Sequence, residues 1–149
     1  MVATIRLAQK KDKDVIVQLL RKARMNAVGV DKPATQFLLA EKASEEPEKR
    51  QLIGTVGVEF FGPCALLRSF VLTNGVDHAR LGLEMIRIVL AYVEQQNVGE
   101  LYMVTPTPSA FFTQLGFSEI GWEALPRDIR QCEHLQRTDR IATPMVYRY

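Results

Sequence analysis

The chain has 149 residues, 47% of them hydrophobic and 24% charged, with a formal net charge of +2 at pH 7. This length and composition predict one folded domain over residues 1–149 and exclude a disordered chain. The near-neutral charge argues against a nucleic-acid-binding surface. The two cysteines, Cys64 and Cys132, have neither the number of a disulfide framework nor the spacing of a zinc site. No run of about twenty apolar residues predicts a membrane span. Because the two cysteines fit a reducing compartment and lack the spacing of metal ligands, we expect a cytoplasmic protein without a metal.

The first half of the chain predicts one helix among strands. Alternating apolar and polar residues indicate a strand at residues 4–8, and Asp12 or Asp14 can cap the helix that follows. That helix has apolar residues at helical spacing: Val15, Ile16, Leu19, Leu20 and Ala23. After a loop at 26–33, strands are expected at residues 36–42, 52–61 and 64–72. The charged segment 43–50 predicts an exposed hairpin turn.

The second half alternates strands and helices. Residues 80–94 carry enough apolar positions for a helix that is buried on more than one side. A strand at 101–105 precedes a short helix at 110–115, which Thr107 or Ser109 can cap and Gly116 ends. Further expected elements are a strand at 117–120, helical turns at 126–133 and a strand at 142–149. The order β-α-β-β-β-α-β-α-β-(α)-β predicts an α/β fold with a single mixed sheet and helices on both faces.

Three short segments carry a resemblance to a known family. Residues 111–117 read FFTQLGF, residues 68–72 read RSFVL and residues 125–129 read LPRDI. They resemble the FYxxLGF signature and the fourth strand of the GNAT (GCN5-related N-acetyltransferase) superfamily. In motif they are nearest to the RSxxV and LPxxI runs of amino-acid N-acetyltransferases of the N-acetylglutamate synthase type, and the element order agrees over nearly the whole chain. The resemblance implies an acyl-CoA N-acyltransferase that moves an acetyl group from acetyl-CoA to the amine of a small molecule, such as an amino acid or an analogue.

The resemblance also places the loop that binds coenzyme A, and this loop departs from the family's pattern. The family has Gln or Arg first, glycine fourth, and Gly or Ala sixth. The corresponding residues here are Asp77, His78, Ala79, Arg80, Leu81 and Gly82. Only Gly82 matches. In the family, N–H groups at this helix start bind the pyrophosphate. Arg80 either blocks that approach or pairs with a phosphate, and Asp77 either opposes the anion or serves as a helix N-cap.

Other parts of the cofactor site follow from the same resemblance. The opening between the fourth and fifth strands of this fold holds the pantetheine arm of the coenzyme. The backbone of Val71, Leu72 and Thr73 is expected to pair with that arm as an added strand would. Phe111 and Phe112 are expected to form a wall of the pocket.

The resemblance implies direct transfer in a ternary complex, in which the neutral amine attacks the thioester. The attacking amine must lose a proton, and Glu59 is the candidate base. Desolvation by Phe60 and Phe61 is expected to raise the pKa of Glu59, although a solvent-facing glutamate fits the same pattern. Phe112 stands where the family often has a tyrosine acid. Tyr102 either replaces that acid or packs in the core.

Arg68 is unusual because it interrupts an apolar strand, and burying a guanidinium without an anion is costly. It either clamps a substrate carboxylate or forms an ion pair with Glu59 or Glu41. Two alternatives to acetyl transfer stay open: a binding or regulatory module that kept the fold and lost catalysis, and an acyltransferase for longer acyl-CoA donors. An apolar last strand at the sheet edge would allow a homodimer.

Overall fold

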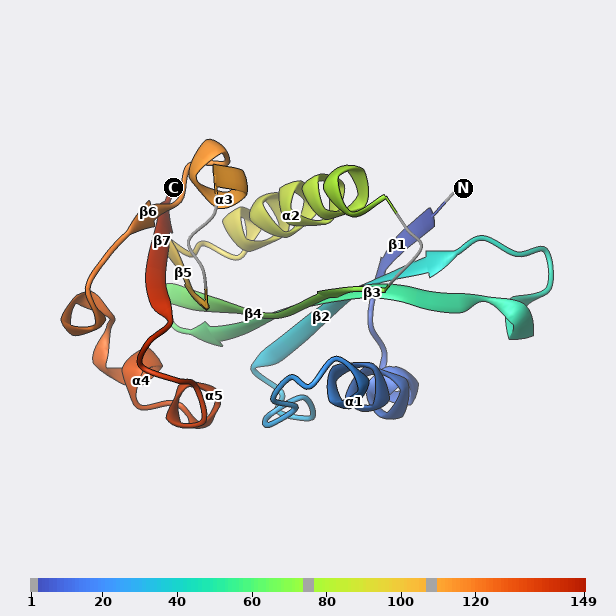
Figure 1. The fold of residues 1–149 in the computed structure, drawn as a ribbon, viewed down its shortest axis with the longest axis horizontal. Helices are drawn as coiled ribbons and strands as arrows, with labels where there is room; N and C mark the ends of the chain where they lie inside the picture. The colour runs from blue at the N-terminus through green and yellow to red at the C-terminus, as the bar shows by residue number, and fades with distance from the viewer. Residues whose placement is uncertain (1–2, 74–76, 107–109) are drawn as a thin grey trace.

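The computed structural model describes residues 3–73, 77–106 and 110–149. A seven-stranded mixed sheet with the order β1-β2-β3-β4-β5-β7-β6 forms its centre (Figure 1). The strands are β1 (Ala3–Leu7), β2 (Thr35–Lys42), β3 (Gln51–Phe61), β4 (Cys64–Leu72), β5 (Glu100–Thr105), β6 (Ser118–Glu119) and β7 (Thr143–Arg148). The helices are α1 (Lys13–Lys22), α2 (His78–Gln95), α3 (Ala110–Gln114), α4 (Arg127–Arg130) and α5 (Glu133–Gln136). Helices α2 and α3 cover one face, and α1, α4 and α5 cover the other.

The expected order of strands and helices is confirmed, and so is the single mixed sheet. Short 3-10 turns at Lys10–Asp12, Pro47–Lys49 and Trp122–Ala124 are additional. The expected helical stretch at 126–133 is two short helices, because Cys132 takes an extended conformation between them. The expected caps Thr107 and Ser109 lie outside the described residues.

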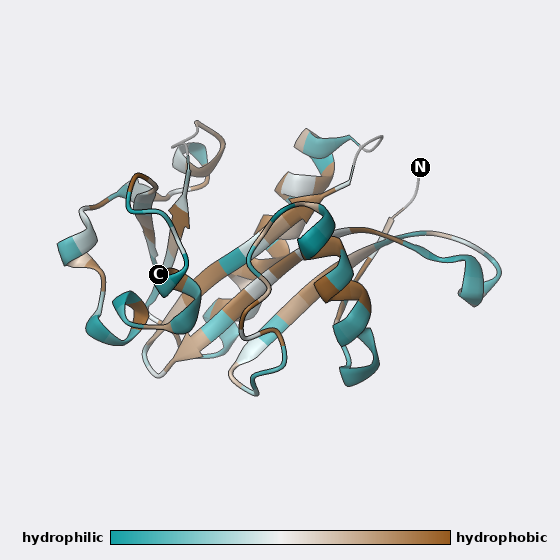
Figure 2. Cartoon of the chain, turned by 60° about the horizontal axis from the view of Figure 1, so that its bottom comes forward, coloured by the Kyte–Doolittle hydropathy of each residue, from teal (hydrophilic) through white to brown (hydrophobic). Residues whose placement is uncertain are grey.

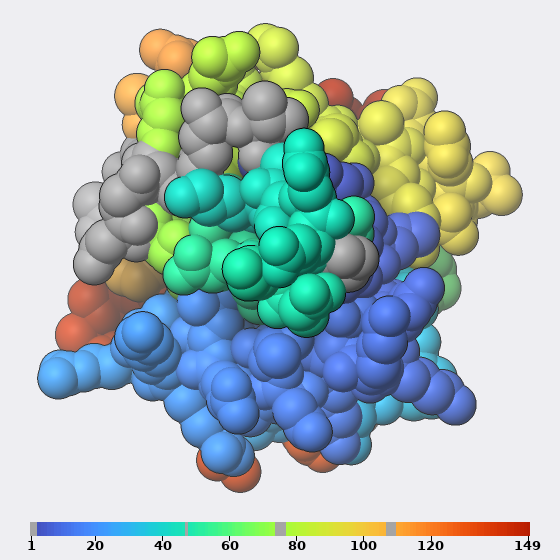
Figure 3. Space-filling model, turned by 90° about the vertical axis from the view of Figure 1, so that its right-hand side faces the viewer, coloured from blue at the N-terminus to red at the C-terminus, as the bar shows by residue number. Residues whose placement is uncertain are grey.

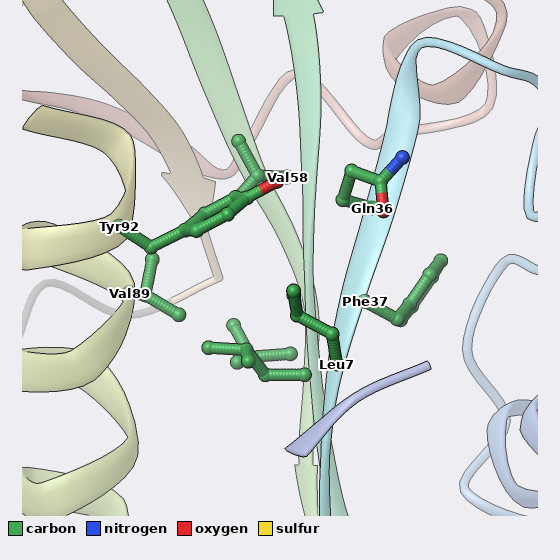
Figure 4. A pocket seen from close by; sticks show the side chains of 8 residues that line it. Leu7, Gln36, Phe37, Val58, Val89 and Tyr92 are labelled. Carbon is green, nitrogen blue, oxygen red and sulfur yellow. The ribbon is translucent and has the colours of Figure 1, made fainter. Parts of the chain in front are cut away.

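The two faces of the sheet have separate cores because strand side chains alternate between faces. Figure 4 shows Val89 and Tyr92 pointing from α2 toward Val58 of β3, while Phe37 points from β2 to the opposite side. Phe37 belongs to the cluster beneath the sheet that α1 completes. Apolar colour follows the strands in Figure 2, and polar colour marks the tip of the β2–β3 hairpin. Residues 43–50 of that hairpin project from the molecule beyond α1 and are mostly exposed, as expected (Figures 1 and 3).

A β-bulge in β4 reverses the alternation at the strand's centre. The register with β3 shifts between Thr55 and Gly57, and Ser69 has a positive φ of 58°. One extra residue in a bulge moves every later side chain to the other face. As a result Leu67 and Phe70 both pack with the core under α2, instead of lying on opposite faces as a regular strand requires.

The last strand does not lie at the sheet edge. β7 pairs with β5 over its whole length and with β6 through Val146 and Met145. The expectation of an open edge there is wrong, because the two-residue strand β6 takes the outer position. A homodimer stays a prediction, but an open edge at β7 no longer supports it.

Candidate active site

A cleft of about 320 Å³ lies where the resemblance places the coenzyme. It is enclosed by the end of β4, the first turns of α2 and the helix α3. Its lining is almost wholly apolar and consists of Phe70, Leu72, His78, Ala79, Gly82 and Phe111. Five of these residues were expected in the cofactor site. Phe70 was not expected there. The bulge in β4 turns its side chain to this face, and the only sign of that bulge in the strand pattern is the polar pair Arg68 and Ser69.

The cleft exists because β4 and β5 separate. The two strands pair in parallel only over Cys64–Leu66 and Glu100–Tyr102. Beyond Leu66, no described strand pairs with that side of β4. A strand whose N–H and C=O groups lack a partner is a template for an extended ligand. The gap that the resemblance implies between the fourth and fifth strands is therefore present.

The first N–H groups of α2 are the groups that would bind an anion, and the Asp77 carboxylate lies beside them. Asp77 is the N-cap of α2, and its Oδ1 accepts a hydrogen bond of 3.2 Å from the N–H of Arg80. The N-cap alternative for Asp77 is confirmed. This hydrogen bond also explains why α2 begins at His78, two residues before the expected start. The side chains of Asp77, His78 and Arg80 are exposed.

The ring of His78 joins the start of α2 to the end of β4. Its Nε2 lies 2.7 Å from the carbonyl oxygen of Thr73, a distance that fits N–H donation from that nitrogen. The N–H of Thr73 donates to the Ile53 carbonyl at 2.9 Å. Both backbone groups of Thr73 therefore have partners. Successive residues of a strand point their N–H and C=O groups to opposite edges, so those of Leu72 point away from β3. They are therefore the groups that would pair with the predicted pantetheine arm.

Gly82 keeps the cleft open. A Cβ at this position would lie 3.3 Å from Cζ of Phe70 and 3.4 Å from Cδ1 of Leu72. Any side chain would therefore enter the space that a ligand needs, which is a steric reason for glycine at the end of the family's pattern.

Two residues expected at the cofactor site support the cleft from behind. Phe112 is buried and makes edge-to-face contacts with Phe70 and Phe111, at centroid distances of 6.4 and 5.0 Å. Leu81 is buried in the core beneath α2. Neither lines the described cleft. Val71 packs on the opposite face of the sheet, in the cluster that α1 completes.

Glu59 and Arg68 form a buried pair on that opposite face. Nη1 of Arg68 lies 3.6 Å from Oε1 of Glu59, and the exposed fractions of the two side chains are 0% and 8%. Nε of Arg68 donates to the hydroxyl of Ser69 at 3.0 Å, and Nη2 donates to the Asn26 carbonyl at 3.4 Å. Burial lowers the pKa of Arg68, and the negative charge of Glu59 opposes that shift. Of the two ion-pair partners expected for Arg68, the structure selects Glu59, because Glu41 accepts a 2.7 Å hydrogen bond from Arg6.

The Arg68 guanidinium has polar neighbours but is closed off from solvent. Nη1 of Arg68 is buried and has no hydrogen-bond partner among the described residues. Gly29 lies over it with a positive φ of 82°, and a Cβ there would come within 3.3 Å of Nη1. Burial, reinforced by the charge of Arg68, lowers the pKa of His134 to about 3, so that its ring is neutral near pH 7. Nδ2 of Asn26 donates to the His134 carbonyl at 3.1 Å, which ties α5 to the loop after α1.

The structure does not bring Glu59 to the cleft beside Gly82. Glu59 pairs with Leu66, which lies roughly 20 Å along β4 from Leu72. Phe60 packs against Tyr92 on the other face, so it does not desolvate the Glu59 carboxylate. Tyr102 lies in the core over α4 and α5, where burial raises its pKa to about 12. Its position fits the packing alternative.

A second cleft, of about 470 Å³, opens on the side of the sheet where the Arg68 side chain lies. It is lined by Val17, Arg21, Met25, Asn26, Ala27, Val28 and Arg137. Arg21 and Arg137 have no acidic partner among the described residues. No motif in the sequence marks this cleft, because its residues come from α1, the following loop and the segment after α5. The floor residue Asn26 is the one whose carbonyl Arg68 contacts.

Within residues 3–73, 77–106 and 110–149, no group of three or more His, Cys, Asp and Glu residues is placed to hold a metal ion. No helix in the same part of the chain combines the length and apolar character needed to cross a membrane.

No protein-family model matches the chain. The uncharacterized protein YwlB of Bacillus subtilis is 26% identical over 138 residues, which make up 90% of this chain and 88% of that protein.

Solved structures give a clear likeness in fold. N-acetylglutamate synthase from Neisseria gonorrhoeae, complexed with coenzyme A and N-acetyl-glutamate, superposes with a TM-score of 0.75 at 15% identity, covering 99% of this chain. The chain spans only 35% of the length of that synthase. A GNAT-family acetyltransferase from Staphylococcus aureus superposes with a TM-score of 0.73 at 14% identity over 99% of both chains. Together with the separated strands β4 and β5, these likenesses show that the chain has the acyl-CoA N-acyltransferase fold of the GNAT superfamily.

Proposed function

We propose that this protein is an N-acetyltransferase that moves an acetyl group from acetyl-CoA to the amine of a small molecule, by direct transfer in a ternary complex. The observation that carries the proposal is the cleft at the open side of β4, which keeps Gly82 and an apolar wall. Coenzyme A is bound in the similar synthase structure, and an apolar cleft beside an unpaired edge of β4 supports binding of its pantetheine arm here.

The chemistry needs little from the protein beyond positioning. The neutral amine nitrogen attacks the thioester carbonyl, the new C–N bond forms, and the C–S bond breaks as the thiolate leaves. The amine proton passes to water or a carboxylate, and the thiolate is protonated from solvent. Because a thiol has a pKa of about 8.5, it leaves without a dedicated acid, so Phe112 in the tyrosine position is compatible with turnover.

Glu59 remains a candidate base only as a prediction. Its buried contact with Arg68 supports a role in neutralising that guanidinium. A Glu59→Gln variant tests the base directly. Loss of about 100-fold in kcat with an unchanged KM supports a base, whereas loss of stability with near-normal kcat supports the ion-pair role.

The second cleft supports an acceptor that has a carboxylate beside its amine, as an amino acid does. Arg21 and Arg137 line it, and both guanidinium groups can bind a carboxylate through paired hydrogen bonds. Arg68 lies just below Asn26, so a substrate carboxylate reaches it only if the loop that carries Gly29 moves. Its role as a substrate clamp stays a prediction.

The test combines titration with acetyl-CoA and an assay for released thiol. Amino acids are compared with matched amines that lack the carboxylate. We expect turnover with the amino acids, and an Arg137→Met variant is expected to raise their KM about tenfold with little change in kcat. Arg127→Met, an exposed arginine on α4 outside both clefts, is the matched control. Absence of acetyl-CoA binding at millimolar concentration refutes the proposal and leaves a GNAT-shaped module with another partner.

A further inference from the structure

The start of α2 beside the donor cleft already holds an anion of its own. The N-terminus of a helix attracts negative charge because its first N–H groups lack partners inside the helix. Here the Asp77 carboxylate accepts from the N–H of Arg80 at 3.2 Å. A ligand phosphate would have to displace that carboxylate or lie beside its negative charge.

The other polar groups of this turn do not compensate. The ring of His78, which lines the cleft, is bound at 2.7 Å to the Thr73 carbonyl. Arg80 supplies one positive charge and Asp77 one negative charge, so the first turn is formally neutral. Glu84 adds a negative charge one turn further on. Nothing described at this helix start amounts to a concentrated positive site for a diphosphate.

The cleft itself has the opposite character. Five of its six lining residues are apolar or glycine, and Gly82 leaves room along its wall. The adjoining edge of β4 has no strand partner beyond Leu66 among the described residues. Backbone pairing and apolar contact suit an amide-containing arm with a thioester at its end. None of the described lining residues is a lysine or an arginine that would bind a nucleotide phosphate.

We propose that the donor site recognises the acyl-pantetheine arm and gains little from the nucleotide diphosphate, so that an acyl-pantetheine thioester without the nucleotide binds nearly as well as acyl-CoA. This inference rests on the proposed function, because it specifies how the same site selects its donor.

The experiment compares the binding of acetyl-CoA and S-acetyl-pantetheine by calorimetry, at about 50 and 500 mM salt. The two dissociation constants are expected to agree within about tenfold, with little salt dependence for either ligand. Phosphate contacts would instead weaken steeply with salt. Asp77→Asn keeps an N-cap side chain and removes only the charge. It is expected to tighten acetyl-CoA binding about fivefold, the effect of one like charge at contact distance in water, and to leave S-acetyl-pantetheine unchanged.

Asp14→Asn, which removes an exposed carboxylate from the first turn of α1, is the matched control and is expected to alter neither affinity. Acetyl-CoA binding that is 100-fold tighter than S-acetyl-pantetheine and falls steeply with salt overturns this inference while leaving the proposed function intact. Failure of both ligands to bind refutes the proposed function and the inference together. Equal tightening of both ligands by Asp77→Asn also overturns the inference, because the carboxylate would then act on the cleft and not on the phosphates.

Discussion

Replacing Arg68 by methionine tests whether its buried pair with Glu59, which joins two neighbouring strands of the sheet, stabilises the fold. At 3.6 Å and an effective dielectric constant of about 20, the attraction between the two charges is about 4–5 kcal/mol. Arg68→Met removes this attraction and leaves the Glu59 carboxylate buried without a counter-charge. The free energy of unfolding is expected to fall by about 3–5 kcal/mol. The double variant with Glu59→Gln buries no charge and is expected to recover at least half of that loss. Urea denaturation of all four proteins gives the coupling energy directly.

The exposed pair of Arg148 and Glu100 provides the control. Its Nε–Oε2 distance is 3.3 Å, but the side chains are 62% and 40% exposed. Arg148→Met is therefore expected to cost less than about 1 kcal/mol. If Arg68→Met costs no more than this control, or if the double variant is as unstable as the sum of the single ones, the pair does not stabilise the fold. Arg68 would then be retained for a ligand, which is the other role that its position in an apolar strand suggests.

Three further predictions concern the cleft and the response to acid. Gly82→Leu is expected to weaken acetyl-CoA binding at least tenfold by filling the cleft, while the helix preference of leucine, about 0.8 kcal/mol over glycine, offsets part of the strain against Phe70 and Leu72. Binding equal to that of the unaltered protein would show that the ligand does not enter there. Hydrogen bonding to Arg6 lowers the pKa of Asp12 to about 2, so the stability that this carboxylate contributes, about 2 kcal/mol, is present above pH 4 and is lost as the pH falls toward 2. Asp12→Asn is expected to remove that loss in acid denaturation curves, and an unchanged slope between pH 4 and 2 would contradict the assignment. Burial lowers the pKa of His134 to about 3, so the unfolded chain binds a proton there that the folded chain does not, and stability falls as the pH drops from about 6.5 to 3. His134→Gln is expected to flatten the dependence of the unfolding free energy on pH across that range, and an unchanged slope would argue against this role of His134.

Much of the fold is visible in local patterns. Alternation and helical spacing place the strands and the long helix to within a few residues, because these elements are set by which side chains must be buried. The position of Gly82 and the aromatic residues of α3 locate the donor cleft once the family pattern is recognised. Two details are not readable in the same way. The bulge at Ser69 depends on a positive φ that serine rarely adopts, and β6 takes the outer edge although it has only two residues.

The functional residues also divide into those that a local sequence pattern predicts and those that only the structure places. Asp77 as an N-cap follows from its place just before an apolar helix, and the structure confirms it. By contrast, the partner of Arg68 is undecided in the sequence, since Glu41 and Glu59 both lie in predicted strands. Only the register of β3 against β4, with Glu59 opposite Leu66 and Gly57 opposite Arg68, brings one carboxylate to the guanidinium. The arginine-lined second cleft likewise joins Arg21 and Arg137, which are far apart in the chain.

The sequence by itself determined the order of the elements and the single mixed sheet, because burial patterns and turn residues act over short stretches of chain. The neighbourhood of the cleft beside Gly82 came from the family resemblance. The tertiary structure decided which face each polar residue occupies. That choice depends on strand register and on one bulge in β4, and a shift of a single residue moves a side chain to the opposite face. For this reason Glu59, expected beside the reacting thioester, lies with Arg68 beneath the sheet, and Phe70 takes a place in the wall of the donor cleft.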